Sequence, residues 1–247
     1  MKHTLAAIAL DAIERPGRIP LATALRAYAE RSGDGDRVSV ASLARAAGLT
    51  PDEARRMLVG TGLFEGSSDR DAGRITLAAP FRPFAAYLRR QTDRTAAAVR
   101  LRGAPRRAGI PEEIWRAAAL FNAGLFFECH EYLEGVWRST PGPERAFYHG
   151  LVQAAAGCYH LEKGNTHGAR TLIQKAVAKL EPYAPAYREV AVTAFLAELR
   201  RVLRWLHRVP RARGQTPLPT LELVGSPRPR QRRVRGGNPS VGLESPL

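Results

Sequence analysis

The stretch RAFYHGLVQAAAGCYHLEK, residues 145–163, is apolar on nearly every side when it is drawn as an α-helix. A soluble protein can shield such a helix from water only by surrounding it with other elements. The stretch therefore predicts the central helix of an antiparallel helical bundle. One narrow polar line remains on it. At about 100° per residue, His149, Gln153 and His160 fall on the same side.

The helix expected before it, LFFECHEYLEGVWR at residues 125–138, mixes ionisable and apolar side chains. At about 100° per residue, His130 and Glu134 share the apolar side of this helix. Glu131 lies at the edge of that side, and Glu128 points the other way. A buried charge needs a partner, because removing an unpaired carboxylate from water costs several kcal/mol. We therefore expect polar partners for His130 and Glu134 on the central helix.

The loop STPGPE between these two helices is short, so the helices are expected to pack as an antiparallel hairpin. Residues at equal distances from the loop then face each other. This geometry predicts that Glu134 lies opposite His149. It also predicts that His130 lies opposite Gln153, with Trp137 covering one end of the cluster.

The run FECHEYLEGVW, followed by FYHGLVQAAAGCYHLEKGNTHGA, resembles the bacterial family called domain of unknown function 309. That family has a His-x-x-x-Glu-x-x-Trp motif, represented here by His130, Glu134 and Trp137. The resemblance extends over residues 121–180 and implies an all-helical domain, usually a small stand-alone protein, without an established activity. The segments before and after the bundle depart from that minimal form, so this chain could have a function that the family does not share. The second half of the resemblance rests on Gly150, Leu151, Gln153, His160, Gly164, Asn165, Gly168 and Ala169.

The favoured interpretation of the polar residues is a hydrogen-bonded network that fixes helix register or binds a small ligand. Buried His–Glu pairs usually have such a role, since each charge needs its partner inside the protein. The cluster comprises His130, Glu131, Glu134, Trp137, His149, Gln153 and His160.

A divalent metal site is the alternative interpretation of the same residues. His130 and Glu134 at i and i+4, with His149 as a third ligand, would suit zinc, iron or manganese and hydrolase-like chemistry. The sequence lacks the Glu-x-x-His repeats of di-iron bundles, and no nucleophile elbow or phosphate loop accompanies the cluster. The sequence therefore leaves open whether a metal binds and whether the protein is an enzyme.

The N-terminal segment has the pattern of a helix-turn-helix. A helix is expected over Ser39–Ala47, a turn at Gly48, and a second helix that begins after Thr50. Thr50 and Glu53 have the spacing of a capping box. Two apolar stretches separated by a polar turn follow and predict a β-hairpin. Together these features resemble a winged helix-turn-helix domain over residues 1–88.

DNA binding by this segment is disfavoured by the residues that open its second helix. Asp52 and Glu53 would place two carboxylates beside phosphate groups, and Arg55 and Arg56 come only afterwards. The alternative role is a small packing or dimerisation module, because one fold hosts many functions.

The formal net charge of +15 points to a third class of function, a protein associated with nucleic acid. Much of the excess lies in residues 89–110 and 208–247, which are expected to form a basic linker and a disordered Arg/Pro-rich tail. In this class the winged helix and the tail bind nucleic acid while the bundle forms a homo-oligomer. The arginines expected to contact nucleic acid are Arg55 and Arg56 in the winged helix and Arg230, Arg232, Arg233 and Arg235 in the tail.

The expected architecture is mainly α, with a winged-helix-like domain at residues 1–88 and an antiparallel helical bundle at residues 111–207. Cys129 and Cys158 are too few for a disulfide framework and favour a reducing cytoplasm. The N-terminal apolar run is interrupted by charges, so it does not predict a signal peptide. No run of roughly 20 apolar residues would cross a membrane.

Overall fold

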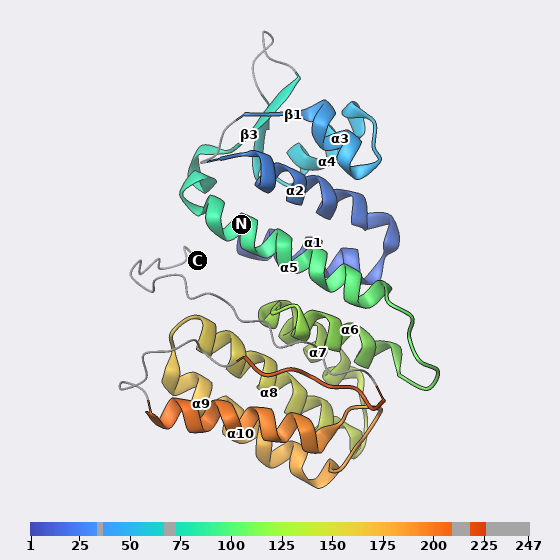
Figure 1. Ribbon diagram of the computed structural model, residues 1–247, viewed down its shortest axis with the longest axis vertical. Coiled ribbons are helices and arrows are strands. Elements are labelled where there is room, and N and C mark those ends of the chain that lie inside the picture. Colours follow the sequence, from blue (N-terminus) through green and yellow to red (C-terminus); the bar gives the residue numbers. More distant parts are fainter. Residues whose placement is uncertain (34–36, 67–72, 209–217, 226–247) are drawn as a thin grey trace.

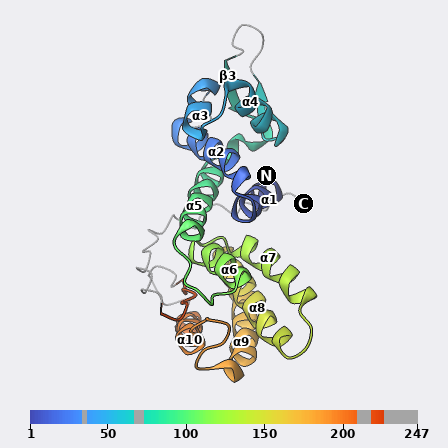
Figure 2. The same cartoon turned by 90° about the vertical axis from the view of Figure 1, so that its right-hand side faces the viewer.

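The computed structural model describes residues 1–33, 37–66, 73–208 and 218–225 (Figure 1). Helices make up most of this part, with one small three-stranded sheet, which confirms the mainly α fold class. Figure 1 shows an elongated molecule in which residues 1–103 form one half and residues 112–208 the other. Figure 2, turned by 90°, shows the same two halves one above the other.

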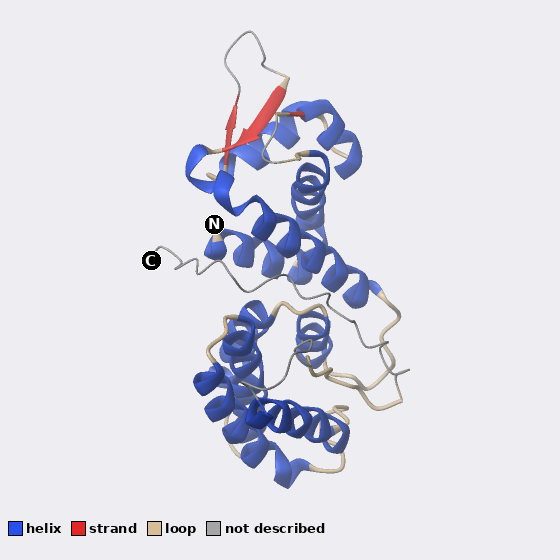
Figure 3. Cartoon of the chain, turned by 60° about the vertical axis from the view of Figure 1, so that its left-hand side comes forward, coloured by secondary structure: helices blue, strands red, loops and turns tan. Residues whose placement is uncertain are grey.

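Helices and a sheet at its outer end build the first half of the molecule. Its first four α-helices are α1 (Lys2–Glu14), α2 (Ile19–Arg31), α3 (Val40–Ala47) and α4 (Pro51–Gly60). The strands are β1 (Val38–Ser39), β2 (Phe64–Gly66) and β3 (Arg74–Leu77). They form an antiparallel sheet in the order β1-β3-β2. Figure 3 shows this sheet at the end of the molecule farthest from the second half.

Two local predictions for this half are confirmed. The backbone N–H of Thr50 donates to Glu53 Oε2 at 2.9 Å, and the N–H of Glu53 donates to Thr50 Oγ1 at 3.3 Å, which completes the capping box of α4. Gly48 ends α3 with a φ of 67°. A glycine adopts this left-handed conformation readily because it has no Cβ.

The basic segment expected as a linker at residues 89–110 is instead helical for most of its length, because α5 spans Ala85–Gly103. The side of α5 that faces the protein buries a regularly spaced set of small, apolar and uncharged residues, namely Leu88, Gln91, Thr92, Thr95, Ala97 and Ala98. The other sides carry exposed arginines such as Arg89, Arg90 and Arg100. The expectation of a linker was wrong because it weighed these arginines and overlooked the helical stripe between them.

The second half is the predicted helical bundle. Its α-helices are α6 (Glu112–Asn122), α7 (Phe126–Ser139), α8 (Glu144–Glu162), α9 (Thr166–Leu180) and α10 (Val192–Arg208). The apolar helix α8 packs against both α7 and α9, as predicted for a central element. A Cβ at Gly150 would lie 2.8 Å from the Leu180 side chain, and one at Gly157 would lie 2.6 Å from the Ile173 side chain. These two glycines therefore allow α8 and α9 to pack closely.

Part of the segment expected as a disordered tail, residues 218–225, is folded against the bundle. Leu221 and Leu223 are 2% and 4% exposed. The Asn122 side chain accepts from the Leu221 N–H at 2.8 Å and donates to its carbonyl at 3.0 Å. Burial of these two leucines offsets the conformational entropy that is lost when the stretch becomes ordered. The prediction of disorder overlooked them. Arg230, Arg232, Arg233 and Arg235 lie outside the described residues.

The buried apolar side chains form two clusters, one in each half, and two helices contribute to both. α1 places Leu5 in the first cluster and Ile13 in the second, and α5 does the same with Leu88 and Ala98. The two halves are therefore joined by two shared helices. Among the described residues, we find no helix with the length and apolar character needed to cross a membrane.

Candidate functional site

α7 buries one continuous side, and His130 lies beside that side. Phe126, Cys129 and Leu133 are each at most 2% exposed, whereas the side chains of His130 and Glu134 are 28% and 25% exposed. The centre of the buried side runs through Cys129, about 100° from His130. The expectation that His130 and Glu134 are set into the apolar side is therefore corrected, because both lie at its edge.

Glu128, expected to point away from the apolar side, is the one acidic residue that is buried in the described part of the chain, at 2% exposure. It faces α5, where Gln91 Nε2 donates to its Oε1 at 3.1 Å. Burial raises the pKa of the Glu128 carboxyl to about 6. The angular argument missed this contact because α5, which supplies Gln91, had been expected as a linker.

His130 is close to two carboxylates of its own helix. Its Nδ1 lies 3.2 Å from Glu131 Oε1, and its Nε2 lies 3.9 Å from Glu134 Oε2. His130, Glu131 and Glu134 offer ligand atoms within 4.8 Å of one another. His149, expected as the third metal ligand, is not in this group. Arg138 already donates to Glu134 Oε1 at 2.6 Å, so a cation would compete with it.

The facing residues of the hairpin differ from the prediction by about three positions. His149 stacks on Trp137, with ring centroids 4.4 Å apart and planes at 23°, where Glu134 had been expected. Further from the loop, Phe127 and Tyr159 face each other at 5.4 Å. Side chains on both helices lean toward their own N-termini, so each surface position is covered by a residue about one place later in the chain. In an antiparallel pair these two offsets of about one residue each add, so they account for about two of the three positions.

The side of α8 that carries His149 and Gln153 is only partly covered. Partial burial lowers the pKa of the His149 imidazole, and the cations Lys179 and Arg145 lower it further, so the ring is neutral at pH 7. Gln153 follows one turn later, and its Oε1 is buried with no hydrogen-bond donor in the described part of the chain. The Arg145 guanidinium lies 4.8 Å from the Trp137 ring. Lys179 and Arg145 were not among the predicted site residues, since only the folded chain brings them here.

His160, expected in the same polar line, has a different environment. Its Nδ1 lies 3.0 Å from Asn165 Nδ2, and the Asn165 side chain accepts from the N–H of Gly168 at 2.8 Å to cap α9. His160 therefore helps to hold the turn between α8 and α9.

The candidate nucleic-acid residues of the first half lie on α4. Arg56 is exposed, while the Arg55 guanidinium lies against the backbone of Gly66 on β2, where a Cβ would be 2.6 Å from its Nη2. Glu53 stays in its capping box, whose hydrogen bonds from Thr50 lower the pKa of its carboxyl. Asp52 is exposed beside it, so α4 presents both charges at its first turn.

Part of the second half is similar in sequence to an uncharacterised family. The family model described as domain of unknown function (DUF309) matches residues 114–172, which include the candidate residues from His130 to His160. The uncharacterised protein YpuF of Bacillus subtilis (strain 168) is 39% identical over 57 residues, or 23% of this chain. The match covers 33% of that relative's length, so the chain spans about a third of it. No solved structure matches the chain.

Proposed function

We propose that the helical bundle is a binding module for a small ligand, which lies against Trp137, His149 and Gln153. The observation that supports this most is the Gln153 carboxamide oxygen, which is buried and has no donor among the described residues. A buried acceptor left unpaired costs about 1–3 kcal/mol. A ligand N–H or O–H group that donates to this oxygen would recover that free energy on binding.

The surroundings favour a planar ligand with a negative charge. The cations Arg145 and Lys179 act on His149, whose neutral imidazole can donate one hydrogen bond and accept another. Trp137 and His149 stack on each other, so a planar ligand would extend this stack from its outer side. These features support a small planar molecule that carries a carboxylate or phosphate group and an N–H or O–H donor.

The substitution Gln153→Leu tests this proposal without knowledge of the ligand. It replaces the carboxamide by an apolar side chain, so the free protein should gain about 1 kcal/mol of unfolding free energy as the unpaired oxygen disappears. Gln174→Leu, at an exposed position on α9, is the matched control and should change stability by less than about 0.5 kcal/mol. Chemical denaturation measures both variants.

Binding itself is measured as the shift in melting temperature with aromatic carboxylates, dicarboxylates and nucleoside monophosphates. At least one compound should stabilise the wild type and the Gln174→Leu protein, but not the Gln153→Leu protein. If Gln153→Leu instead destabilises the free protein by 1 kcal/mol or more, the oxygen has a partner and the proposal fails.

A divalent cation at His130, Glu131 and Glu134 is a second candidate. The mutual distances of their ligand atoms support it, and one imidazole with two carboxylates suits zinc or manganese. Calorimetric titration with Zn²⁺ should show binding that His130→Ala removes, whereas His167→Ala, at an exposed histidine of α9, should keep it. Equal heats from wild type and His130→Ala would exclude this site. Elemental analysis of the purified protein tests independently whether a metal is bound.

We also propose that residues 1–88 form a winged helix-turn-helix domain and that residues 111–207 form the bundle domain. The order α2, β1, α3, α4, β2, β3 and the sheet order β1-β3-β2 support this proposal. Hydrogen exchange of the full chain tests the division. Amides of α2 to α4 should open together, at a free energy different from that of α8 and α9. Opening of all these helices in one step would mean a single cooperative unit.

A further inference from the structure

A continuous series of cations and aromatic rings crosses the seam between the two halves. Its members, in spatial order, are Arg90, Tyr87, Lys163, Tyr159, Phe127 and Lys2, and we call them the cation–ring ladder. They come from α5, the end of α8, α7 and α1. The sequence gives no sign of this series, because its members are far apart along the chain.

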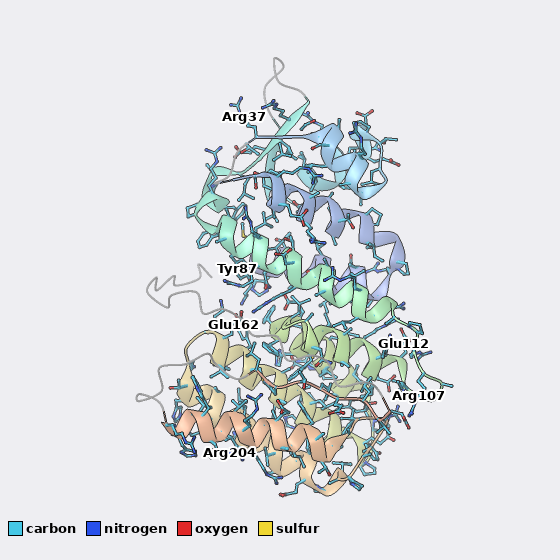
Figure 4. The ribbon with its side chains drawn as sticks, in the orientation of Figure 1. Arg37, Tyr87, Arg107, Glu112, Glu162 and Arg204 are labelled. Carbon is cyan, nitrogen blue, oxygen red and sulfur yellow. The ribbon has the colours of Figure 1, made fainter. Side chains whose placement is uncertain are left out.

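The contacts of the ladder are all shorter than 6 Å. The Arg90 guanidinium lies 5.4 Å from the Tyr87 ring, and Lys163 Nζ lies 5.7 Å from Tyr87 and 5.6 Å from Tyr159. The Tyr159 and Phe127 rings are 5.4 Å apart. At the far end, Lys2 Nζ lies 4.5 Å from the centre of the Phe127 ring. Figure 4 shows Tyr87 on α5 and Glu162 on α8 at the same end of the seam.

Positive charge exceeds negative charge along the ladder. Glu162 is engaged by Arg94 at 2.6 Å and lies 4.0 Å from Arg90. Within the described part of the chain, no carboxylate lies within ion-pair distance of Lys2 or Lys163. Arg90 and Lys163 are exposed, and the three rings are half-buried. The surface therefore offers Lys163, which has no carboxylate partner among the described residues, and Arg90, whose ion pair with Glu162 is long at 4.0 Å, beside rings that solvent can reach.

This alternation matches the chemistry of single-stranded nucleic acid. Phosphates need flexible cations, and unpaired bases stack on aromatic rings. A lysine or arginine above a ring at an exposed site contributes only about 0.5–1 kcal/mol, so a phosphate can draw it away and leave the ring face to a base. Duplex DNA offers the phosphates but hides the base faces.

We propose that the cation–ring ladder is a binding surface for single-stranded nucleic acid. Arg90 and Lys163 contact consecutive phosphates, and a base stacks on Tyr87 between them. This surface lies apart from α4, and it is independent of the small-ligand site on α8.

The experiment uses the full chain and a fluorescent single-stranded oligothymidine, with anisotropy measured at several salt concentrations. The double variant Arg90→Gln/Lys163→Gln removes two phosphate contacts. Its affinity should fall, and its dependence on log salt should be flatter by roughly 1.4, at about 0.7 per contact in a single strand. The matched control Lys175→Gln/Arg204→Gln removes one lysine and one arginine at exposed positions of α9 and α10. Equal losses in the two double variants would show that only total charge matters and would overturn the proposal.

The ring is tested separately by Tyr87→Leu and Tyr87→Phe. Loss of one stacked base should weaken binding about fivefold or more in Tyr87→Leu, while Tyr87→Phe keeps the ring and should bind as the wild type does. Melting temperatures confirm that both variants are folded. Wild-type binding by Tyr87→Leu would overturn the proposal, and so would equal competition by polyglutamate of the same length, which would identify a surface for acidic proteins.

Discussion

Glu128 and Glu134 lie on the same helix, α7, but on sides with different surroundings. Glu128 is buried against α5 and accepts a hydrogen bond from Gln91. Glu134 lies at an open edge, where exposed Arg138 pairs with it. The covered side of α7 joins the two halves of the molecule, and the open side carries the candidate ligand site. The comparison shows that a neighbouring element decides whether a glutamate on an amphipathic helix is structural or available.

The largest expected effect concerns the covered side. The folded-state pKa of Glu128, about 6, lies above its ordinary value of 4.5. The resulting stabilisation is full below about pH 4.5 and is lost as the pH rises through about 6. Relative to Glu128→Gln, which does not titrate, the wild type should therefore lose about 2 kcal/mol of unfolding free energy between pH 4 and pH 7.5. Urea denaturation of both proteins across this pH range measures the loss. If the difference in unfolding free energy between wild type and Glu128→Gln stays constant, the Glu128 carboxyl is as accessible as that of Glu134.

The next effect concerns the open side, where Trp137 stacks on His149. Trp137→Leu removes the stack and the contact with Arg145. We expect a loss of about 1 kcal/mol of unfolding free energy at pH 7, because an aromatic pair contributes about 0.5–1.5 kcal/mol beyond the effect of its buried area. Trp205→Leu on α10 is a control for the loss of an indole at a half-buried position. An unchanged denaturation midpoint for Trp137→Leu would mean that the ring is free in solution.

A smaller effect concerns His149 on the open side, where stability should change with pH in the direction opposite to that of Glu128. The pKa of His149 is lowered from its ordinary value of 6.5 by burial, Lys179 and Arg145. Stability from the neutral ring is present above that ordinary value and is lost as the pH falls through the lowered pKa. The wild type should therefore lose stability on acidification relative to His149→Gln, whereas Glu128 has the reverse effect. NMR titration of the imidazole checks the direction, and a raised pKa would contradict the placement of the two cations.

The smallest effect is expected at Glu134. Glu134→Gln removes an ion pair with Arg138, whose side chain is 70% exposed. Such surface pairs typically contribute less than about 1 kcal/mol, so the denaturation midpoint should hardly change. A loss of 2 kcal/mol or more would show that the open side of α7 is buried in solution, for example by a second copy of the chain.

Much of the bundle could be predicted because local patterns carry it. The apolar stretch around Leu151 and Ala154 has to be surrounded, and the short loop before Glu144 makes its neighbour antiparallel. The capping box of Thr50 and Glu53 is equally local, since both partners lie within one helical turn. Periodicity and short-range geometry were sufficient for these features.

The candidate site could be predicted only in part. Trp137 and His149 were expected in one cluster, and they are in contact. The pairing of Glu134 with His149 was not found, because the lean of side chains along each helix shifts which residues face each other. The cations Lys179 and Arg145 come from α9 and from the start of α8, so the sequence pattern of α7 contains no information about them.

Local patterns in the sequence predict the helices of the bundle and the capping box of α4, because periodicity and capping depend on neighbours within a few turns. Tertiary structure alone decided what covers each face. Gln91 of α5 lies against the buried Glu128, and Leu221 and Leu223 bring residues 218–225 onto the bundle. The physical reason is that burial, and with it the pKa of Glu128 and the exposure of His130, depends on contacts between residues distant in sequence. A helical pattern shows that a face needs a cover, and only the folded chain shows which element provides it.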